Sequence, residues 1–571
     1  MLKLTKAKNI NLTIIAVLFF AGAARIWGIG FGLPNTACRP DEKVIIDTAL
    51  MFGRGNINPG WFYWPTFYMY LLFFCYAVYF LFGIVSGKYV SMIDFIAEYT
   101  IDPSNFYLID RILASCLGTV TVFIVYKAAK CLFDKKIAII SSFFLSLAYL
   151  HVRDSHFGVT DIPATFLITC AFLFIVKSYK DKTLKNYVYA GIFTGLATAT
   201  KYGGVLLLVP MFIVHFFNSI DKRLETFLNK RILSFLIVFT LAFSTGTPFA
   251  LLDLSNCIRT CLLQYEALFV AYKSSLGAEW LYHLRFSLFY GLGWALFFSS
   301  LAGALLLIKL NIRKAAILCS FPLIYYSIAG QSYLVYLRYM LPLIPFFCVT
   351  AAVFTVNISN RINKHLKPAL ERPVTFAIAI LIIIPSVYNV ILFNRLLSER
   401  DNRLIAAEWV NENVKGGSSF YQSGSPWGRL QLPLMTEELE KIYEDSVAKG
   451  GQGRLAKAEI DYHKTKNIVG YETWEYDSGQ RKFIFNGREK DILPDYIIIE
   501  ESPLALFSKP PVHLNELLRD FYNLKKSFKA ININAKGNLF DQQDAFYMPF
   551  IGFKGVTRPG PNIYIYERNA V

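Results

Sequence analysis

Acidic and basic side chains gather at two points where the chain leaves an apolar stretch. The first is CRPDEKVIIDTALMFGRG, in which Asp41 and Glu42 follow Pro40 and precede apolar residues at helical spacing. The second is YLHVRDSHFGVTDIPATF, whose ionisable residues are His151, Arg153, Asp154, His156 and Asp161. A carboxylate can take the proton of an attacking hydroxyl, and Arg, Lys or His can neutralise a phosphate that leaves. These residue types therefore suit the transfer of a group from a phosphate to a hydroxyl.

Both groups also have a purely structural interpretation. Asp41 and Glu42 would be stabilised at the positive end of the helix that they begin, and Asp161, just before a proline, could begin the next one. The second group is too dense for capping or solvation to explain it easily, because ionisable side chains are costly at a membrane rim. Within it, Arg153 suits bidentate binding of an oxyanion. His156 could donate to a phosphate or position a carboxylate.

Two single basic residues interrupt other apolar stretches. Lys201 lies in ATATKYGGVLLL, and Arg338 lies in SYLVYLRYMLPLIPF. Either side chain could anchor its helix at the interface by snorkelling. The functional alternative is that both contact a phosphate at the membrane surface.

Aromatic residues supply weaker candidates. GWFYWPTFYMY holds an aromatic group that could form either an interfacial belt or a platform for a sugar or lipid: Trp61, Tyr63, Trp64 and Tyr68. QYEALFVAYKSSLGAEWLYHLRFS predicts an interfacial helix with Tyr265, Glu266 and His283. No CxxC or HExxH spacing occurs in the chain, so a metal has little support, although a carboxylate pair could hold one.

The composition shows what must position these residues. Of 571 residues, 54% are hydrophobic and only 17% are charged, and the mean hydropathy is +0.40. A soluble domain carries about 25% charged residues. The chain is therefore neither an ordinary soluble protein nor a disordered one, and its apolar surface requires lipid.

Apolar stretches that could cross a bilayer recur up to residue 394. A crossing helix needs about 20 predominantly apolar residues, and shorter ones are tolerated inside a bundle. We expect eleven crossings, at 10–33, 107–126, 137–151, 163–177, 187–201, 203–217, 232–250, 286–308, 314–330, 338–356 and 374–394.

The charge distribution sets the orientation of these crossings. Six basic segments each carry +2 or +3 and together account for the net charge of +17: 1–9, 126–137, 177–186, 218–231, 309–314 and 357–373. With eleven crossings, all six fall on one side, which the positive-inside rule makes cytoplasmic. The charge is therefore not a nucleic-acid footprint. The N-terminus is expected in the cytoplasm, and Asp41, Lys201 and Arg338 on the outer side.

One apolar segment conflicts with this count. Residues 64–85 are long enough to cross, but a crossing there would invert every later loop. We expect a re-entrant or outer-leaflet helix instead, within a first outer loop at 34–106. The alternative is a true crossing with a second one within 86–106.

The chain beyond residue 394 has the pattern of a small soluble domain. SSFYQ, DYIIIE and NIYIYER predict strands, and DNRLIAAEWVNENV, TEELEKIYEDSVAKGG and VHLNELLRDFY predict helices. We therefore expect a transmembrane domain at 1–394 and an extracytoplasmic α/β domain at 395–571.

The motifs also occur in an order that resembles a known family. In sequence they are ARIWGIGFGLPN, RPDE, NPGWFYWPTFYMYL, IDRILASCLGTVTVFIVYKAAKCLF, HVRDSHFGVTDIPATF, GLATATKYGGVLLLVP and LRYMLPLIPF. Over about residues 20–415, the chain resembles the membrane glycosyltransferases of the GT-C fold. The nearest branch is the protein O-mannosyltransferase and aminoarabinose transferase superfamily, especially its prokaryotic phospholipid-carrier-dependent members.

The resemblance implies a polytopic all-α membrane fold and an inverting transfer of a monosaccharide from a polyprenyl-phosphate donor. The family's acidic pair falls on Asp41 and Glu42, with Asp41 as base or acceptor-positioning carboxylate. Its phosphate-binding basic residue matches His156 by spacing or Arg153 by charge, and the protein mannosyltransferases have Arg where His156 stands. Lys201 and Arg338 match patterns that contact the lipid phosphate.

The same resemblance implies the partners and location of the protein. The acceptor, a protein, lipid or polysaccharide, would be modified on the outer face of a bacterial or archaeal plasma membrane. No cofactor is required and no nucleic acid is involved. Asp161, Tyr63 and Trp64 are expected to support the site. The alternative is a transporter or flippase of a lipid-linked sugar, which would place ionisable groups near the bilayer midplane between repeats.

Overall fold

The computed structural model describes residues 12–219, 229–270, 279–364, 370–448 and 453–569. The basic segment 1–9, most of 218–231 and part of the predicted interfacial helix lie outside these ranges. The chain forms two compact units. Unit 1 comprises Met1–Trp27, Asp47–Phe73 and Asp110–Asn394, and unit 2 comprises Gly28–Ile46, Phe74–Ile109 and Arg395–Val571.

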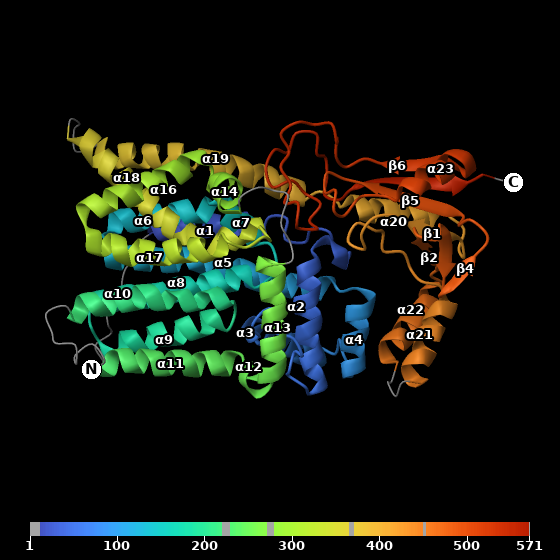
Figure 1. Cartoon of the computed structure of the whole chain (residues 1–571), viewed down its shortest axis with the longest axis horizontal. Helices are drawn as coiled ribbons and strands as arrows, with labels where there is room; N and C mark the ends of the chain where they lie inside the picture. Colours follow the sequence, from blue (N-terminus) through green and yellow to red (C-terminus); the bar gives the residue numbers. More distant parts are fainter. Residues whose placement is uncertain (1–11, 220–228, 271–278, 365–369, 449–452, 570–571) are drawn as a thin grey trace. The chain divides into compact units, whose positions relative to one another are not determined.

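The regular elements in the described part of unit 1 are helices (Figure 1). Its helices are α1 (Leu12–Ile26), most of α5 (Ser104–Leu132), α6 (Lys135–Leu147), α7 (Tyr149–Asp154), α8 (Asp161–Lys180), α9 (Leu184–Thr198), η3 (Tyr202–Leu207), α10 (Leu208–Ser219), α11 (Lys230–Gly246), α12 (Phe249–Leu252), α13 (Leu254–Phe269), α14 (Glu279–Tyr282), η5 (His283–Leu288), α15 (Phe289–Leu292), α16 (Trp294–Leu310), α17 (Ile312–Ala329), η6 (Leu337–Leu343), α18 (Ile344–Asn363) and α19 (Glu371–Leu397). The short elements α7, η3 and η6 begin where longer helices break.

Several helices are long and apolar enough to cross a membrane. In the described ranges there are seven, or eight if one bent pair counts as a single span. The chain is therefore an integral membrane protein, but the expected count of eleven crossings is not confirmed. The predicted crossings at 10–33, 137–151, 187–201 and 232–250 correspond to α1, α6, α9 and α11, which are only 13 to 17 residues long. Residues 64–85 correspond to α3 (Phe67–Val85), which is one of the seven helices long and apolar enough to cross a membrane.

The segment predicted to cross at 286–308 contains a sharp break. The helical path bends by 109° between Glu279–Leu292 and Trp294–Leu310. Gly293, at the break, has a φ of 81° and a ψ of 140°, a conformation outside the helical region that glycine adopts readily. A Cβ at this position would also lie 3.0 Å from the backbone nitrogen of Ser386, so the residue type fits both the turn and the packing.

Unit 2 contains a seven-stranded sheet with the order β4-β3-β2-β1-β5-β7-β6. Its strands are β1 (Ser419–Gln422), β2 (Glu472–Asp477), β3 (Lys482–Phe485), β4 (Arg488–Lys490), β5 (Tyr496–Glu501), β6 (Tyr522–Phe528) and β7 (Asn562–Arg568). β1 pairs in parallel with β2 and β5, and the other pairings are antiparallel. The helices are α20 (Asn402–Asn413), α21 (Thr436–Ala448), α22 (Arg454–Lys466) and α23 (Val512–Phe521). The expectation of a small C-terminal α/β domain is confirmed.

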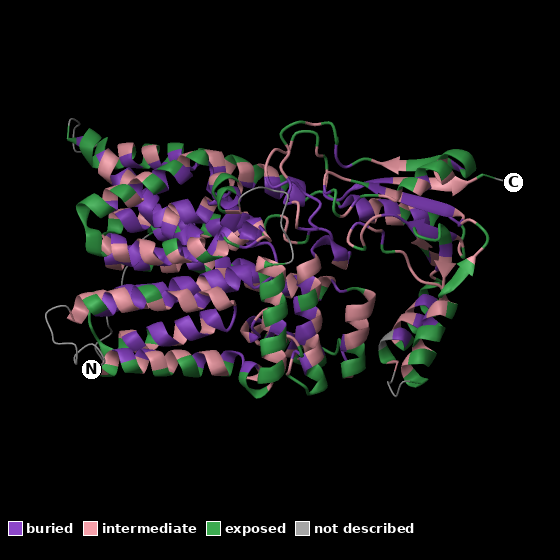
Figure 2. Cartoon of the chain, viewed as in Figure 1, coloured by how far each residue is buried: buried purple, intermediate pink, exposed green. Residues whose placement is uncertain are grey.

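The centre of this sheet is buried on both faces, as Figure 2 shows for β1 and β5. Tyr496 and Ile498 join one apolar cluster, and Ile497 joins another. Strands covered on both faces have nearly continuous apolar runs. This is why YIIIE was recognisable as a strand from its sequence alone.

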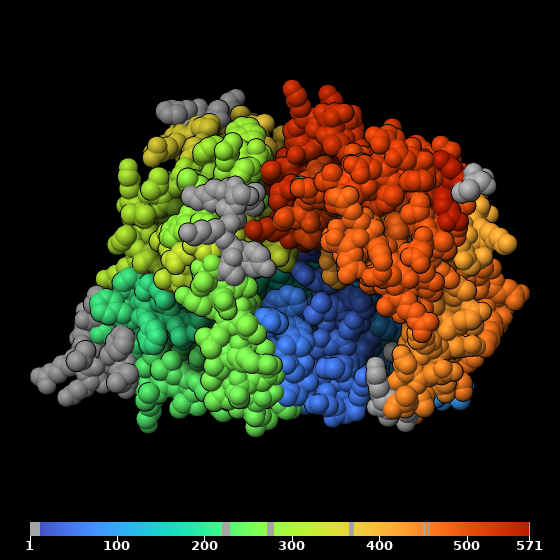
Figure 3. Space-filling model, turned by 45° about the vertical axis from the view of Figure 1, so that its right-hand side comes forward, coloured from blue at the N-terminus to red at the C-terminus, as the bar shows by residue number. Residues whose placement is uncertain are grey.

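Two early segments belong to the same compact unit as this domain. They hold η1 (Thr36–Cys38), the start of α2 (Pro40–Met51), the end of α3, and α4 (Met92–Ile101). In the space-filling view these early residues are blue and the C-terminal domain is orange to red (Figure 3). Unit 2 is thus assembled from early and late parts of the chain that are more than 280 residues apart in sequence.

Candidate active site

Unit 1 brings three of the predicted residues together. Lys201 Nζ lies 2.5 Å from Asp161 Oδ1, and Arg338 Nε lies 3.8 Å from Asp161 Oδ2. The three side chains are mostly buried, with exposed fractions of 5% for Asp161, 8% for Arg338 and 20% for Lys201. We call them the cation cluster, because two cations share one carboxylate. Charge interactions are strong in such mostly buried surroundings.

Breaks between helices position Asp161 and Lys201. Asp161 is the first residue of α8, where a carboxylate is favoured by the helix dipole. Lys201 stands in extended conformation between α9 and η3. Gly204 allows η3 to lie against the end of α9, because a Cβ on it would lie only 2.6 Å from the backbone carbon of Ala197. The lysine is therefore held at a turn rather than on a helix surface.

Arg338 is held at a third break. It lies in η6, which contains Pro342 and continues into α18. Proline removes a backbone donor, so it favours a short irregular segment before the helix over a continuous one. The Arg338 guanidinium carbon lies 4.2 Å from the ring centroid of Tyr336, and Lys201 Nζ lies 5.1 Å from that of Tyr339. Both cations thus have an aromatic face beside them.

Arg153 and His156 are placed differently. Both are buried, and Arg153 donates to the neighbouring Asp154 at 3.0 Å. The two ring nitrogens of His156 lie 2.9 Å from the carbonyl oxygen of Val152 and 3.1 Å from that of Trp27. These contacts of Arg153 and His156 are with groups other than the Asp161 carboxylate.

Two further buried charges were missed in the sequence. Arg25, in α1, is fully buried and bonds three backbone carbonyls, Ser155 Oγ, and His151 Nδ1 at 2.8 Å. Asp110, in α5, accepts from the Tyr68 hydroxyl at 2.5 Å. Each is a charged residue inside an otherwise apolar stretch, and that signal would have identified both.

The acidic pair, Asp41 and Glu42, lies in the first turn of α2 in unit 2. Glu42 is fully buried, whereas the Asp41 side chain is 28% exposed. Arg39 Nη2 lies 3.9 Å from Asp41 Oδ2, and its other terminal nitrogen contacts Asp544 of the C-terminal domain. Asp41 is thus the carboxylate of the pair that a substrate could reach.

The aromatic and weaker candidates have mixed placements. Trp61 packs its ring 5.7 Å from that of Trp64, and Tyr63 is 41% exposed. Tyr68 is buried, so its inclusion in an exposed aromatic belt is wrong. Tyr265 and Glu266 are exposed on α13, while His283 is buried against Ser287.

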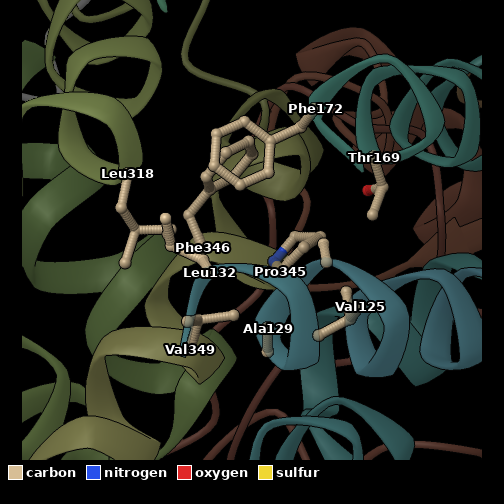
Figure 4. A pocket seen from close by; sticks show the side chains of 10 residues that line it. Val125, Ala129, Leu132, Thr169, Phe172, Leu318, Pro345, Phe346 and Val349 are labelled. Carbon is tan, nitrogen blue, oxygen red and sulfur yellow. The ribbon is translucent and has the colours of Figure 1, made fainter. Parts of the chain in front are cut away.

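The residues do not group into a metal centre. Within the described ranges, no set of three or more His, Cys, Asp or Glu side chains could hold an ion. A small pocket between α5, α8, α17 and α18 is lined by apolar side chains and Thr169 (Figure 4). It therefore lacks groups for proton or phosphate chemistry.

Comparison with known proteins extends these findings. Residues 109–248 match the model of the family described as dolichyl-phosphate-mannose-protein mannosyltransferase. A search of curated proteins found no sequence match. ArnT from Cupriavidus metallidurans, bound to undecaprenyl phosphate, is 12% identical with a TM-score of 0.51, and the match covers 97% of both chains. The oligosaccharyltransferase AglB from Archaeoglobus fulgidus is 12% identical with a TM-score of 0.47, over 98% of this chain and 88% of that chain.

The matched region and the fold agree with the expectation from the motifs. The family model spans four predicted site residues, Arg153, His156, Asp161 and Lys201. The likeness to ArnT extends over nearly the whole chain. The chain therefore has the fold of the GT-C membrane glycosyltransferases, and the resemblance to the protein O-mannosyltransferase and aminoarabinose transferase superfamily is confirmed.

Proposed function

We propose that this protein is an inverting glycosyltransferase that moves a monosaccharide from a polyprenyl-phosphate donor to an acceptor hydroxyl. The observation that carries the proposal is the cation cluster, in which Lys201 and Arg338 both lie beside the Asp161 carboxylate. Two neighbouring cations suit a lipid phosphate, whose oxygens can accept hydrogen bonds from both. The family match over residues 109–248 supports the same class of donor.

The chemistry needs one base and one anion site. The acceptor oxygen attacks the anomeric carbon, its proton passes to Asp41, and the bond from that carbon to the phosphate oxygen breaks with its electron pair. The leaving polyprenyl phosphate is stabilised by Lys201 and Arg338. Glu42, which is fully buried, is assigned to the support of Asp41 rather than to proton transfer.

Arg153 and His156 remain predicted ligands of the donor phosphate. Arg153 is paired with Asp154, and both ring nitrogens of His156 lie near backbone carbonyls. A phosphate would have to replace these contacts to bind either side chain, so we rank both below Lys201 and Arg338. Asp161, Tyr63 and Trp64 are proposed as supporting residues.

We propose the finer topology of the sequence analysis as well. It has eleven crossings, a cytoplasmic N-terminus, a transmembrane domain at 1–394 with the first outer loop at 34–106, and an outer domain at 395–571. The helices of 13 to 17 residues at four predicted crossings support it, because a bundle tolerates short spans. The proposed location is a bacterial or archaeal plasma membrane.

A transporter or flippase of a lipid-linked sugar is the second candidate. The 109° bend at Gly293 favours it, because transporters often use broken helices around their substrate. The clustered charges favour the transferase, because Asp161 begins α8 and Lys201 follows α9, at helix ends rather than near the midplane where transporters place ionisable groups. Neither proposal specifies which sugar the lipid carries, and the transferase proposal does not specify the acceptor molecule.

The test is transfer by the purified full-length protein in lipid vesicles. A panel of undecaprenyl-phosphate sugars with radiolabelled hexose or pentose is incubated with cell-envelope acceptors. The proposal expects labelled covalent product and free undecaprenyl phosphate. Movement of the labelled lipid between leaflets without covalent product would instead establish the transporter.

A further inference from the structure

Residues 28–46, which we call the acidic loop, include the first turn of α2 with Asp41 and Glu42. The C-terminal domain of the same unit holds this segment. Arg39 is fully buried, and its guanidinium forms an ion pair with Asp544, whose side chain is 6% exposed. Asp544 lies 503 residues after Asp41 in the chain. A buried ion pair between such distant segments fixes them to each other, because separating it would leave an unpaired charge away from water.

Aromatic packing reinforces this ion pair. The Arg39 guanidinium carbon lies 5.7 Å from the ring centroid of Phe546, two residues after Asp544. The same ring packs edge-on against Phe31 at 5.9 Å. Residues 544–546 therefore contact residues 28–46 in two ways. Asp544 forms an ion pair with Arg39, and Phe546 packs against Phe31.

A second attachment lies beside the first. The Cys38 thiol contacts Asp401 Oδ2 at 3.5 Å, and Arg403 Nη2 approaches the same sulfur at 3.1 Å. Gln431 donates to the Thr36 hydroxyl at 2.9 Å. Burial alone would raise the pKa of Asp401, but the charge and hydrogen bonds of Arg403 outweigh it and hold that pKa below its ordinary value. Asp401 and Arg403 thus form an ion pair that contacts the Cys38 thiol.

These contacts converge immediately before the acidic pair. Arg39 precedes Asp41 by two residues, and Pro40 between them has a restricted φ. Arg39 also lies 3.9 Å from the Asp41 carboxylate, so the position of Asp544 affects Asp41 through a single side chain. Side chains of the C-terminal domain therefore hold the residues just before Asp41, and Asp544 and Asp41 both lie near the Arg39 guanidinium.

We propose that Asp544 is a positioning residue for Asp41, acting through Arg39, with Phe546 as its apolar support. The proposal rests on the function assigned to Asp41 above. It gives the C-terminal domain a role in catalysis through the position of Asp41. A displacement of a catalytic group by about 1 Å can lower a rate on the order of 10²-fold, so small shifts in this loop matter.

The experiment compares variants of the full-length protein in lipid vesicles. Asp544→Asn removes the charge, Asp544→Glu restores it, and Phe546→Leu loosens the support without changing any charge. Asp520→Asn is the matched control, because Asp520 is an acid of the same domain in an exposed pair with Arg519. The rate of transfer, the KM for the donor, and hydrogen exchange of residues 28–46 are measured for each.

The expected result for Asp544→Asn is a kcat about 10- to 100-fold lower with a donor KM within about twofold of the parent. Hydrogen exchange should rise in residues 28–46 more than elsewhere in unit 2. Asp544→Glu should recover most of the rate, Phe546→Leu should lie between, and Asp520→Asn should match the parent. An unchanged kcat, or exchange raised equally throughout residues 395–569, would overturn the proposal.

Hydrogen exchange also separates this inference from the proposed function. If the parent protein transfers no sugar, the glycosyltransferase assignment fails, yet the attachment of the loop can still be measured. Faster exchange confined to residues 28–46 in Asp544→Asn would then support the positioning role for this loop. Identical exchange in parent and variant would reject it.

Discussion

The two charged regions of this protein are arranged around groups of opposite charge. In unit 1, Lys201 and Arg338 both lie beside the Asp161 carboxylate. In unit 2, Arg39 stands among acids, with Asp544 paired to it and Asp41 at 3.9 Å. Two neighbouring cations suit a phosphate, and a partly exposed carboxylate suits proton transfer. The comparison separates the two tasks of the proposed reaction between two sets of residues.

The regions also differ in how the chain builds them. The cation cluster uses three helix breaks within one unit, at α8, η3 and η6. The acidic loop depends on side chains contributed by the C-terminal domain. Changes in the cation cluster should therefore affect mainly donor binding, whereas changes in unit 2 should affect mainly the rate.

The largest expected effect is that of Asp41→Asn. Loss of a general base lowers a rate by about 10²- to 10⁴-fold, so kcat should fall by that factor while donor affinity changes little. The measurement is single-turnover transfer of labelled sugar together with equilibrium binding of undecaprenyl phosphate. Glu437→Gln, a change to an acid in the first turn of α21, is the control. Parent-like turnover in Asp41→Asn would contradict the assignment of proton transfer to Asp41.

The next effect concerns the cation cluster. Lys201→Gln removes one cation from the proposed phosphate site, and a hydrogen bond to a charged group contributes about 1.5–3 kcal/mol. Affinity for undecaprenyl phosphate should therefore fall about 10- to 100-fold, as measured by competition with a fluorescent lipid phosphate. Lys464→Gln, in an exposed pair with Glu440, should leave it unchanged. Equal affinities for Lys201→Gln and the parent would remove the cluster from the donor site.

A pH effect tests unit 2 by itself. Burial raises the pKa of Glu500 from 4.5 to about 7, and its carboxylate accepts from the Tyr547 hydroxyl at 3.3 Å. Between about pH 4.5 and 7 the folded state keeps a proton that the unfolded state has lost. The stabilisation from this group is therefore complete below that window and lost as pH rises through it, by about 3 kcal/mol at most.

Glu500→Gln should remove this dependence. Thermal unfolding of unit 2, followed across pH 4.5 to 7.5, should show a falling midpoint for the parent and a flatter profile for the variant. Glu489→Gln, which changes an acid in an exposed pair with Lys482, should keep the slope of the parent. Parallel profiles for Glu500→Gln and the parent would contradict the shifted titration.

The smallest effect is structural and lies in unit 1. A Cβ at Gly204 would lie 2.6 Å from two backbone atoms at the end of α9, so Gly204→Ala must shift the turn that holds Lys201. The expected loss of stability is about 1–3 kcal/mol, typical of overpacking, with some loss of donor affinity. Gly22→Ala has no heavy atom closer than 3.9 Å and should not destabilise the protein. Thermal unfolding with and without undecaprenyl phosphate measures both.

Much of the fold could be predicted from the sequence because its signals are local. Apolar length identified the membrane helices, and YIIIE and NIYIYER identified two of the central strands. β3 and β4 were missed because they are short. β6 was missed because its residues are largely exposed and alternate only weakly between apolar and polar. The break at Gly293 was missed because a single glycine in an apolar run does not indicate whether the helix bends.

The candidate site was predictable only in part. Asp161, Lys201 and Arg338 each interrupt an apolar stretch, and the charge distribution placed them on one face. Their sharing of one carboxylate depends on packing between distant helices. The pairing of Arg39 with Asp544 has no local signal at all, because Asp544 lies in a polar loop where acids are common.

The most direct measurement of the central claim is a structure of the full-length protein in a lipid nanodisc with undecaprenyl phosphate bound. The account predicts that the phosphate lies within hydrogen-bonding distance of Lys201 and Arg338, with Asp161 still beside both cations. A phosphate held by other residues, with the three side chains of the cation cluster unchanged and free of lipid, would contradict it.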